Sequence, residues 1–301
     1  MSKILVIRGG AIGDFILTLP VLSALRRQFP NARLELLAYP HIAQLAVAGG
    51  LADAVRSIDA RPLAGFFARG PLDPALQSYF AEFPIILSYL YDPDHIFQTN
   101  VLQTFRGQFI AGPHRPDDTK KQHATEVFLE PLQRLAIFEA DPVPCLTIPA
   151  SVPDPRPKLI ALHPGSGSER KNWLLPNWIA LAKELAGRGD LSLLLVGGEA
   201  ELDKLTKITA ALPPGRIEVA AGLPLVKLAE RLSSCAGFLG HDSGITHLAA
   251  ALGLRTLALW GDTPETVWRP RGDHVALLRH PTGLQELPSQ EVFEAALAFF
   301  H

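Results

Sequence analysis

The sequence of 301 residues has few features that would place it outside the ordinary soluble proteins. Its two cysteines, Cys145 and Cys235, are far apart and have no metal-ligand spacing, so we expect free thiols in a reducing compartment. No apolar run approaches the roughly 18 residues of a membrane span. The first apolar run, Ile4 to Ile7, is too short for a signal peptide. We therefore expect a cytoplasmic protein whose contact with a membrane is at most peripheral.

The sequence also lacks an excess of charge of one sign. Lysine and arginine number 28 against 30 acidic residues, which gives a formal net charge of −2. A protein that binds nucleic acid through bulk charge would be basic, so no nucleic-acid partner is predicted. Hydrophobic residues make up 48% of the chain, which is enough to build substantial cores, and the length suggests about two domains.

The first half alternates short apolar runs with amphipathic segments. Such a pattern is typical of parallel sheets covered by helices. The polar segment 104–123 is predicted to be a loop, 124–138 a helix, and the proline-rich segment 140–157 a linker between domains. Strands are predicted at 3–7, 32–39, 54–59 and 83–91.

The alternation restarts after the linker and predicts a second doubly wound domain. We therefore predict an α/β fold of two Rossmann-like domains facing across a cleft, which would suit an enzyme with two substrates. The predicted domains are 1–153 and 154–285. A terminal helix, 286–301, would begin near Ser289, with packing back on the first domain as one option.

The stretch "RGGAIGDF" after the first strand raises the question of a dinucleotide site. Gly10 and Gly13 fit the second and third glycines of the G-x-G-x-x-G fingerprint, but Arg8 occupies the first position. Glu35 could take the place of the acid that binds the ribose. Because the fingerprint is broken, we do not predict a dehydrogenase. The simplest alternative is a tight turn in which Asp14 caps the following helix.

Four motifs, in order along the chain, resemble a known family. They are "GAIGDFILTLPVLSALRRQFPNA", "HPGSGSERKNW", "VGGEAE" and "GHDSGITHLAAALG". Together they are similar to glycosyltransferase family 9, the ADP-heptose heptosyltransferases of lipopolysaccharide core synthesis. The resemblance implies the GT-B fold and transfer without a bound metal or cofactor. It departs from the family at "WGDTPETVW", where a Gly-Pro-Thr-Asp-Pro-like turn is usual, and at His241, where asparagine is common.

The resemblance also assigns roles to individual residues. It implies that Asp14 is the catalytic base, that Lys171 contacts phosphate or sugar, and that Glu199 binds the nucleotide ribose. For each residue a structural role is an alternative: a helix cap for Asp14, a solvated surface lysine for Lys171, and a helix N-terminal acid for Glu199.

The motif "HDSGITH" is expected to bind the donor diphosphate. Backbone N–H groups at a helix start lack partners within the helix, and the helix dipole favours an anion there. Asp242 would contact the donor sugar. Alternatively, Asp242 and Ser243 only cap a helix that packs inside, and His247 is a core histidine. The predicted donor-site residues are Ser166, Ser168, Lys171, Asp242, Ser243, Gly244, Ile245, Thr246 and His247.

The acceptor is expected at the first domain. Family acceptors are phosphorylated glycolipids of the Kdo-lipid A type, which implies an anionic partner at the cytoplasmic face of the inner membrane. The basic residues of the segment 104–123 would meet this partner, and the alternative is that this segment is only a mobile, solvated loop. The predicted acceptor-site residues are Gly10, Ala11, Ile12, Gly13, Arg115, Lys120 and Lys121.

The predicted function is therefore an inverting transfer of a sugar, heptose from ADP-heptose, to a lipopolysaccharide-core or related glycan acceptor. Two other functions remain open at this stage. One is a nucleotide-sugar epimerase, which would need a different acid and base and no acceptor. The other is an inactive paralogue that only binds a nucleotide sugar.

Overall fold

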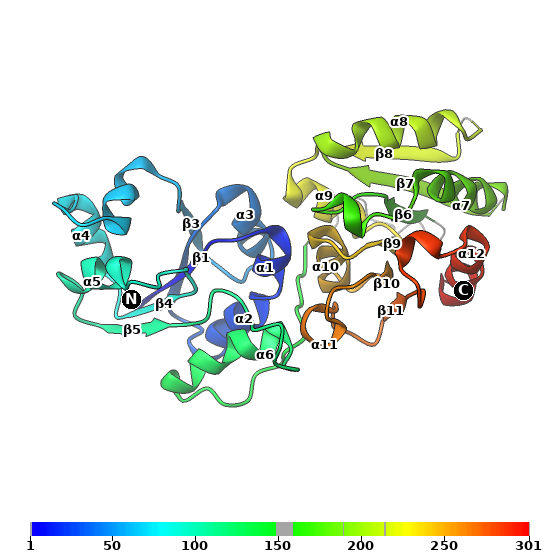
Figure 1. The fold of residues 1–301 in the computed structure, drawn as a ribbon. Helices are drawn as coiled ribbons and strands as arrows, with labels where there is room; N and C mark the ends of the chain where they lie inside the picture. Colours follow the sequence, from blue (N-terminus) through cyan, green and yellow to red (C-terminus); the bar gives the residue numbers. More distant parts are fainter. Residues whose placement is uncertain (1, 149–158, 189, 214, 301) are drawn as a thin grey trace. The chain divides into compact units, whose positions relative to one another are not determined.

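The computed structural model describes residues 2–148, 159–188, 190–213 and 215–300 (Figure 1). The chain divides into two compact units, Met1–Pro144 and Cys145–His301. The predicted domain boundary at 153 lies outside the described residues. No helix among the described residues is long and apolar enough to cross a membrane.

Unit 1 contains a parallel sheet with the strand order β3-β2-β1-β4-β5. The central strand β1 is buried on both faces, as expected for a sheet covered by helices. Its strands are β1 (Lys3–Arg8), β2 (Arg33–Ala38), β3 (Ala54–Ser57), β4 (Ile85–Ser88) and β5 (Gln108–Ala111). Its helices are α1 (Ile12–Ile16), α2 (Leu19–Gln28), α3 (Pro40–Ala48), α4 (Pro74–Ala81), α5 (Ile96–Leu102) and α6 (Ala124–Leu129), with 3₁₀ turns at Arg61–Phe67 and Glu130–Leu135.

Two predictions for unit 1 were wrong in detail. The segment predicted as a loop over 104–123 contains the edge strand β5, which pairs with β4 and buries Phe109 and Ile110. The helix predicted over 124–138 changes to a 3₁₀ turn at Glu130, where Pro131 cannot donate the hydrogen bond that would continue an α-helix.

Unit 2 contains a second parallel sheet with the order β11-β10-β9-β6-β7-β8 (Figure 1). Its strands are β6 (Leu159–His163), β7 (Ser192–Gly197), β8 (Ile217–Ala221), β9 (Gly237–His241), β10 (Arg255–Leu259) and β11 (Val275–Leu278). Its helices are α7 (Leu175–Gly187), α8 (Leu202–Ala210), α9 (Leu225–Leu232), α10 (Gly244–Ala251), α11 (Glu265–Trp268) and α12 (Ser289–Phe300), with 3₁₀ turns at Glu169–Lys171, Glu199–Glu201 and Leu284–Glu286.

The C-terminal region completes unit 2. Strand β11 pairs with β10 and adds a sixth strand that the sequence pattern did not reveal. Helix α12 packs against α7 and β10, and its residues Val292 and Ala296 are fully buried in the core of unit 2. Helix α12 is therefore part of the core of unit 2, and the option that it also packs on the first domain stays a prediction.

Both sheets reverse their strand order at one point. In unit 1 the reversal lies between β1 and β4, and in unit 2 it lies between β6 and β9. Ligands of doubly wound sheets bind beyond the carboxyl ends of the strands at such a point. A ligand is therefore expected at the loops after Arg8 and Ser88 in unit 1 and after His163 and His241 in unit 2.

Candidate active site

A charged cluster lies at the switch point of unit 2. The Nζ atom of Lys171 lies 2.6 Å from Oδ2 of Asp242, and the hydroxyl of Thr263 donates to the same oxygen at 2.5 Å. Asp242 follows β9, Lys171 ends the loop after β6, and Thr263 follows β10. The Asp242 side chain is only 10% exposed, whereas that of Lys171 is 43% exposed. Lys171 therefore presents a positive charge to solvent beside a nearly buried carboxylate.

Helix α10 begins directly after Asp242. Ser243 is its N-cap, and the Ser243 hydroxyl accepts a hydrogen bond from the Thr246 amide at 3.3 Å. The Thr246 hydroxyl donates to the His241 carbonyl, and the Thr246 residue is fully buried. Both donors of Thr246 are therefore used inside the protein, and the amides of Gly244 and Ile245 are better placed to meet a ligand.

His247, also predicted to contact the donor, is buried on the inner side of α10. Its amide donates to the Ser243 carbonyl at 3.2 Å. The role of the His247 imidazole, as a donor contact or as a core histidine, stays a prediction.

The loop after β6 is shaped by its own serines. The Ser166 hydroxyl donates to the Ser168 carbonyl at 2.7 Å and also accepts from the Ser168 amide. Ser168 then precedes the 3₁₀ turn Glu169–Lys171, which ends at the lysine of the charged cluster. Ser166 and Ser168 therefore shape the loop that presents Lys171.

The buried imidazole of His241 joins this loop to the sheet. Its Nε2 atom accepts from the Trp173 amide at 2.8 Å and from the Trp178 indole at 3.3 Å. Its Nδ1 atom lies 3.2 Å from the Gly165 carbonyl, so the neutral tautomer with hydrogen on Nδ1 satisfies all three contacts. Burial lowers the pKa of His241 to about 3. The histidine at this position is thus a neutral structural link.

The acid predicted to bind ribose follows β7. Glu199 is exposed at the start of its 3₁₀ turn, and in the described part of the chain its carboxylate has no ion pair or hydrogen bond. Glu201 instead takes the structural role, since its Oε2 accepts from the Gly198 amide at 2.8 Å. Glu201 also packs against Gly165, where an added Cβ would lie 2.5 Å from its side chain. Glu199 is left available to a ligand.

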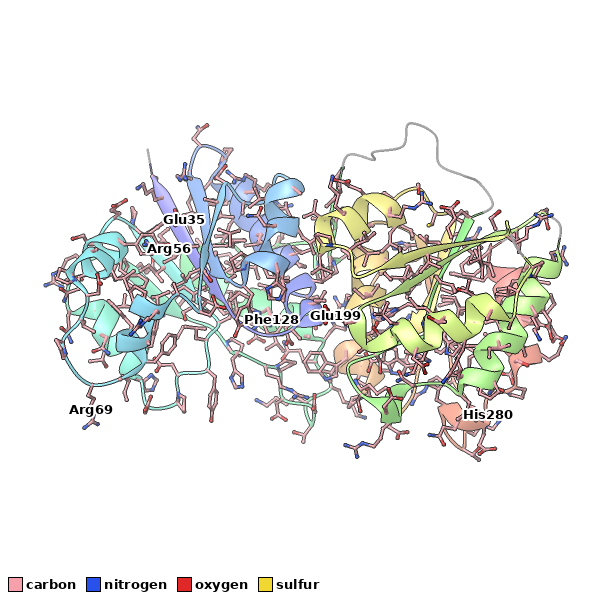
Figure 2. The ribbon with its side chains drawn as sticks, turned by 90° about the horizontal axis from the view of Figure 1, so that it is seen from above. Glu35, Arg56, Arg69, Phe128, Glu199 and His280 are labelled. Atoms are coloured by element: carbon pink, nitrogen blue, oxygen red, sulfur yellow. The ribbon has the colours of Figure 1, made fainter. Side chains whose placement is uncertain are left out.

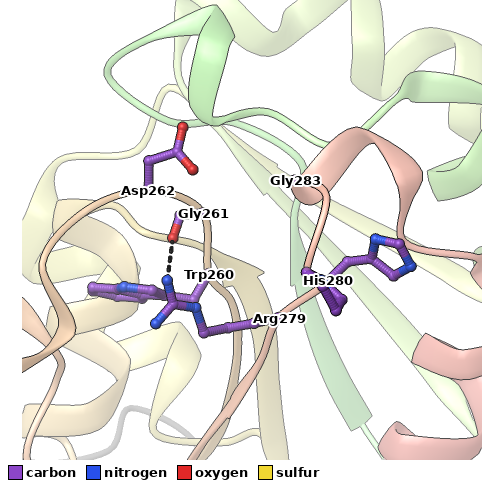
Figure 3. A pocket seen from close by; sticks show the side chains of 7 residues that line it. Trp260, Gly261, Asp262, Arg279, His280 and Gly283 are labelled. Carbon is purple, nitrogen blue, oxygen red and sulfur yellow. Dashed lines mark hydrogen bonds between the residues drawn. The ribbon is translucent and has the colours of Figure 1, made fainter.

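A pocket lies between the loops that follow β10 and β11 (Figure 3). Arg279 crosses it and donates to the Gly261 carbonyl at 3.2 Å. The Trp260 indole donates to the Thr263 carbonyl at 2.8 Å, which connects the pocket wall to the residue that holds Asp242. The pocket is lined by Trp260, Gly261, Asp262, Arg279, His280, Pro281 and Gly283.

In unit 1, Asp14 lies in the first turn of α1. Its Oδ2 accepts from the Ala11 amide at 3.1 Å, and its side chain is 30% exposed. Gly10 makes this turn possible, because its φ of 100° is strained for other residues and an added Cβ would lie 2.9 Å from Asp14 Oδ2. Asp14 therefore caps its helix, as the structural alternative predicted, and still reaches solvent.

The other residues predicted for the acceptor site lie at the same end of the sheet of unit 1. Ala11, Ile12 and Gly13 form the turn and the start of α1 after β1. The basic residues Arg115, Lys120 and Lys121 are exposed in the segment after β5, where Arg115 pairs with Asp118 at 2.8 Å.

Glu35 does not fit the role of a ribose-binding acid. It lies within β2 rather than after it, and it accepts a hydrogen bond from the Tyr79 hydroxyl at 2.7 Å. Arg56, which is labelled beside Glu35 in Figure 2, lies over the Tyr79 ring. With Arg8 in place of the first glycine, unit 1 lacks both parts of a dinucleotide site.

Three residues of the site were missed from the sequence. Arg8 was noted only as a mismatch, yet it contacts Asp14; Thr263 holds Asp242; and Glu201 supports the loop of Gly165. The segment "WGDTPETVW", which contains Thr263, was noted as a departure from the turn usual in the family. No sequence pattern indicated that Thr263 contacts Asp242. Among the described residues, no group of three potential metal ligands is present.

Solved structures show the fold class of this protein. A glycosyl transferase of family 9 from Veillonella parvula superposes with a TM-score of 0.81 at 18% identity, covering 99% of this chain and 97% of that one. The Escherichia coli heptosyltransferase WaaC, solved with ADP, superposes with a TM-score of 0.77 at 17% identity and covers 99% of both chains. The predicted α/β fold of the GT-B class, with two Rossmann-like domains, is thus confirmed.

The family follows from the sequence. The family described as glycosyltransferase family 9 (heptosyltransferase) matches residues 120–296, and the chain belongs to this family. A curated relative, lipopolysaccharide heptosyltransferase 1 of Pseudomonas aeruginosa, is 36% identical over 110 residues. That alignment covers 36% of this chain and 29% of the relative.

Proposed function

We propose that this protein is an inverting glycosyltransferase that transfers heptose from ADP-heptose to a lipopolysaccharide-core or related glycan acceptor. Membership of family 9 supports sugar transfer. The name of the Pseudomonas relative and the ADP in the Escherichia coli structure support the choice of donor and acceptor. The observation that carries the proposal is the cluster of Lys171, Asp242 and Thr263 at the switch point of unit 2.

The donor diphosphate is proposed to bind in front of α10. The amides of Gly244 and Ile245 and the ammonium of Lys171 would offset the negative charge that grows as ADP leaves. Ser243 caps the helix and gives its turn a fixed shape. Ser166 and Ser168 contribute by shaping the loop of Lys171.

The donor sugar is proposed to contact Asp242. Lys171 and Thr263 both bind Oδ2 of this carboxylate, which orients it and leaves Oδ1 for a sugar hydroxyl. Glu199 would accept hydrogen bonds from the two ribose hydroxyls, since its carboxylate is exposed at the end of the neighbouring strand β7.

The acceptor is proposed to bind to unit 1, where Asp14 acts as the base. The turn Gly10–Gly13 would contact the acceptor sugar. The exposed charges of Arg115, Lys120 and Lys121 would attract its phosphate groups. An acceptor of this kind would bring the protein to the cytoplasmic face of the inner membrane as a peripheral protein.

The reaction is proposed to be a single displacement. Asp14 accepts the proton of an acceptor hydroxyl while that oxygen attacks the anomeric carbon. The bond from this carbon to the phosphate oxygen breaks, and its electron pair leaves with ADP on the opposite face, so the configuration inverts. A carboxylate is a weak base, and placing the hydroxyl correctly therefore supplies much of the rate.

A transfer assay with ADP-heptose and a core acceptor tests this proposal. We expect Asp14→Asn to lose at least about 10²-fold in kcat, because general-base catalysis contributes at least that much. Binding of ADP-heptose by the variant should be unchanged. The matched control on the same unit is Asp73→Asn, since Asp73 also accepts from a backbone amide at a helix start. Normal turnover of Asp14→Asn would contradict the assigned base. A wild-type chain that binds ADP-heptose but transfers nothing would be an inactive paralogue.

A further inference from the structure

Arg8 is a buried charge that the proposed reaction does not use. It is the last residue of β1 and only 3% of its surface is exposed. Its guanidinium lies 4.5 Å from the centre of the Phe128 ring, within the range of a cation–π contact. Burial lowers the pKa of Arg8, and the nearby Asp14 carboxylate opposes this change. Arginine nevertheless stays charged in proteins, so this cation needs partners.

The partners of Arg8 lie on helix α1 and on the segment after β5, which are far apart in sequence. Its Nη2 donates to the backbone carbonyl of Asp14 at 3.1 Å, and its Nη1 donates to the carbonyl of His114 at 2.8 Å. The first carbonyl belongs to the turn that carries the proposed base. The second belongs to the segment after β5 that contains Arg115. A single planar group therefore joins the base to the segment proposed to meet the acceptor.

The arrangement leaves the Asp14 carboxylate able to react. The closest approach of Arg8 to a carboxylate oxygen is 3.9 Å, which is too long for a hydrogen bond. The guanidinium thus holds the backbone of Asp14 and attracts its charge without occupying the oxygen lone pairs that must accept a proton. A direct two-point salt bridge would fix the carboxylate more firmly but would make it a poorer base.

We propose that Arg8 is the positioning residue of the catalytic base, holding Asp14 in register with the acceptor segment through its bonds to the Asp14 and His114 carbonyls. This inference rests on the proposed function, because it requires that Asp14 is the base. It predicts an effect on the chemical step and none on the donor, whose proposed ligands are in unit 2.

Steady-state kinetics of Arg8→Gln and Arg8→Lys test the inference. We expect Arg8→Gln to lower kcat by about 10²-fold, the cost of misplacing a reacting group by roughly 1 Å. The KM for ADP-heptose should not change. Arg8→Lys should recover part of the loss, because lysine keeps the charge but cannot make two bonds in one plane.

Arg26→Gln is the matched control. Arg26 also bridges two segments of unit 1, with bonds of 3.0 Å to the Ala32 carbonyl and 2.8 Å to the Asp53 carboxylate, but it contacts neither Asp14 nor His114. The Nε atoms of both arginines are buried without a hydrogen-bond partner in the described structure. The kcat of Arg26→Gln should stay within about twofold of the wild-type value.

A second comparison separates positioning from a general loss of structure. In the Asp14→Asn background, Arg8→Gln should cause no further loss of the residual rate, because two residues that act through one group are not additive. An equal loss in both backgrounds would overturn the inference, and so would an unchanged kcat for folded Arg8→Gln. If Arg8→Gln does not fold, the kcat of folded Arg8→Lys decides, and a wild-type value would overturn the inference. Normal turnover by Asp14→Asn would instead overturn the assigned base on which the inference rests, and failure of the wild type to transfer would overturn the proposed function.

Discussion

At the scale of single residues, the site depends on side chains that hold other side chains. Lys171 and Thr263 both bind one carboxylate oxygen of Asp242. The imidazole of His241 joins the loop of Gly165 to Trp173 and Trp178. The motif residues Lys171 and Asp242 could be predicted from the sequence. The hydrogen bonds that hold this site together could not be predicted, because their partners are distant in sequence. Thr263 lies 21 residues from Asp242, and Trp173 lies 68 residues from His241.

His241 makes the stability of unit 2 sensitive to acid. Its folded-state pKa of about 3 lies below the ordinary value of 6.5, so the unfolded chain binds a proton first as the pH falls. The contribution of His241 to stability is therefore complete above pH 6.5 and is lost as the pH falls toward 3. Burial lowers the pKa of His163 as well, so this residue acts in the same direction. Each such histidine changes the free energy of unfolding by at most about 1.4 kcal/mol per pH unit.

Denaturant unfolding between pH 7 and pH 4 measures this slope. All four tryptophans, Trp173, Trp178, Trp260 and Trp268, lie in unit 2, so their fluorescence reports that unit. We expect the unfolding free energy of His241→Asn to depend less steeply on pH than that of the wild type. The half-buried His280 of unit 2 provides the control substitution, His280→Asn. Equal slopes for His241→Asn and the wild type would show that the buried imidazole is not the cause.

At the scale of elements, the turn between β1 and α1 places the base. Gly10 has a φ of 100°, and a Cβ there would meet the Asp14 carboxylate at 2.9 Å. Gly9 has no such φ, and a Cβ on it would make only ordinary contacts at 3.7 and 3.9 Å. The two adjacent glycines therefore form a matched pair.

We expect Gly10→Ala to lower both stability and kcat, and Gly9→Ala to change neither greatly. The left-handed backbone alone costs alanine about 1–2 kcal/mol, and displacement of Asp14 adds a loss of activity. Thermal unfolding and the transfer assay measure the two effects. If Gly10→Ala matched Gly9→Ala in both measurements, the shape of this turn would not matter to the base.

Elements with a strong apolar pattern could be predicted, and short edge strands could not. β1 and β6 are buried along nearly their whole length, and their apolar runs are visible in the sequence. β5 and β11 have four residues each, and β5 lies in a polar segment with glycines on either side. Such strands form because a neighbouring strand offers its hydrogen bonds, and that neighbour is distant in sequence. For the same reason, the sequence did not indicate which core α12 would join.

At the scale of the whole molecule, the proposed reaction is divided between two Rossmann-like units. Unit 1 carries the proposed base and acceptor residues, and unit 2 carries the proposed donor residues. The repetition of strand order in the two sheets could be expected from the sequence, since each half begins with a buried strand and a glycine-containing loop. The hydrogen bond between Arg8 and His114 could not be expected from the sequence, because it joins residues 106 positions apart.

Calorimetric titration with ADP-, GDP- and UDP-sugars tests this division most directly. We expect ADP-heptose to bind at one site per chain, with equal affinity for the wild type and Asp14→Asn. Lys171→Ala should bind about 10-fold to 100-fold more weakly, because it loses a hydrogen bond to a charged group. Lys204→Ala, which loses only the pairing of Lys204 with Glu169 on the loop after β6, should bind as the wild type does. Failure of the wild type to bind any nucleotide sugar, or unchanged affinity in Lys171→Ala, would contradict the account.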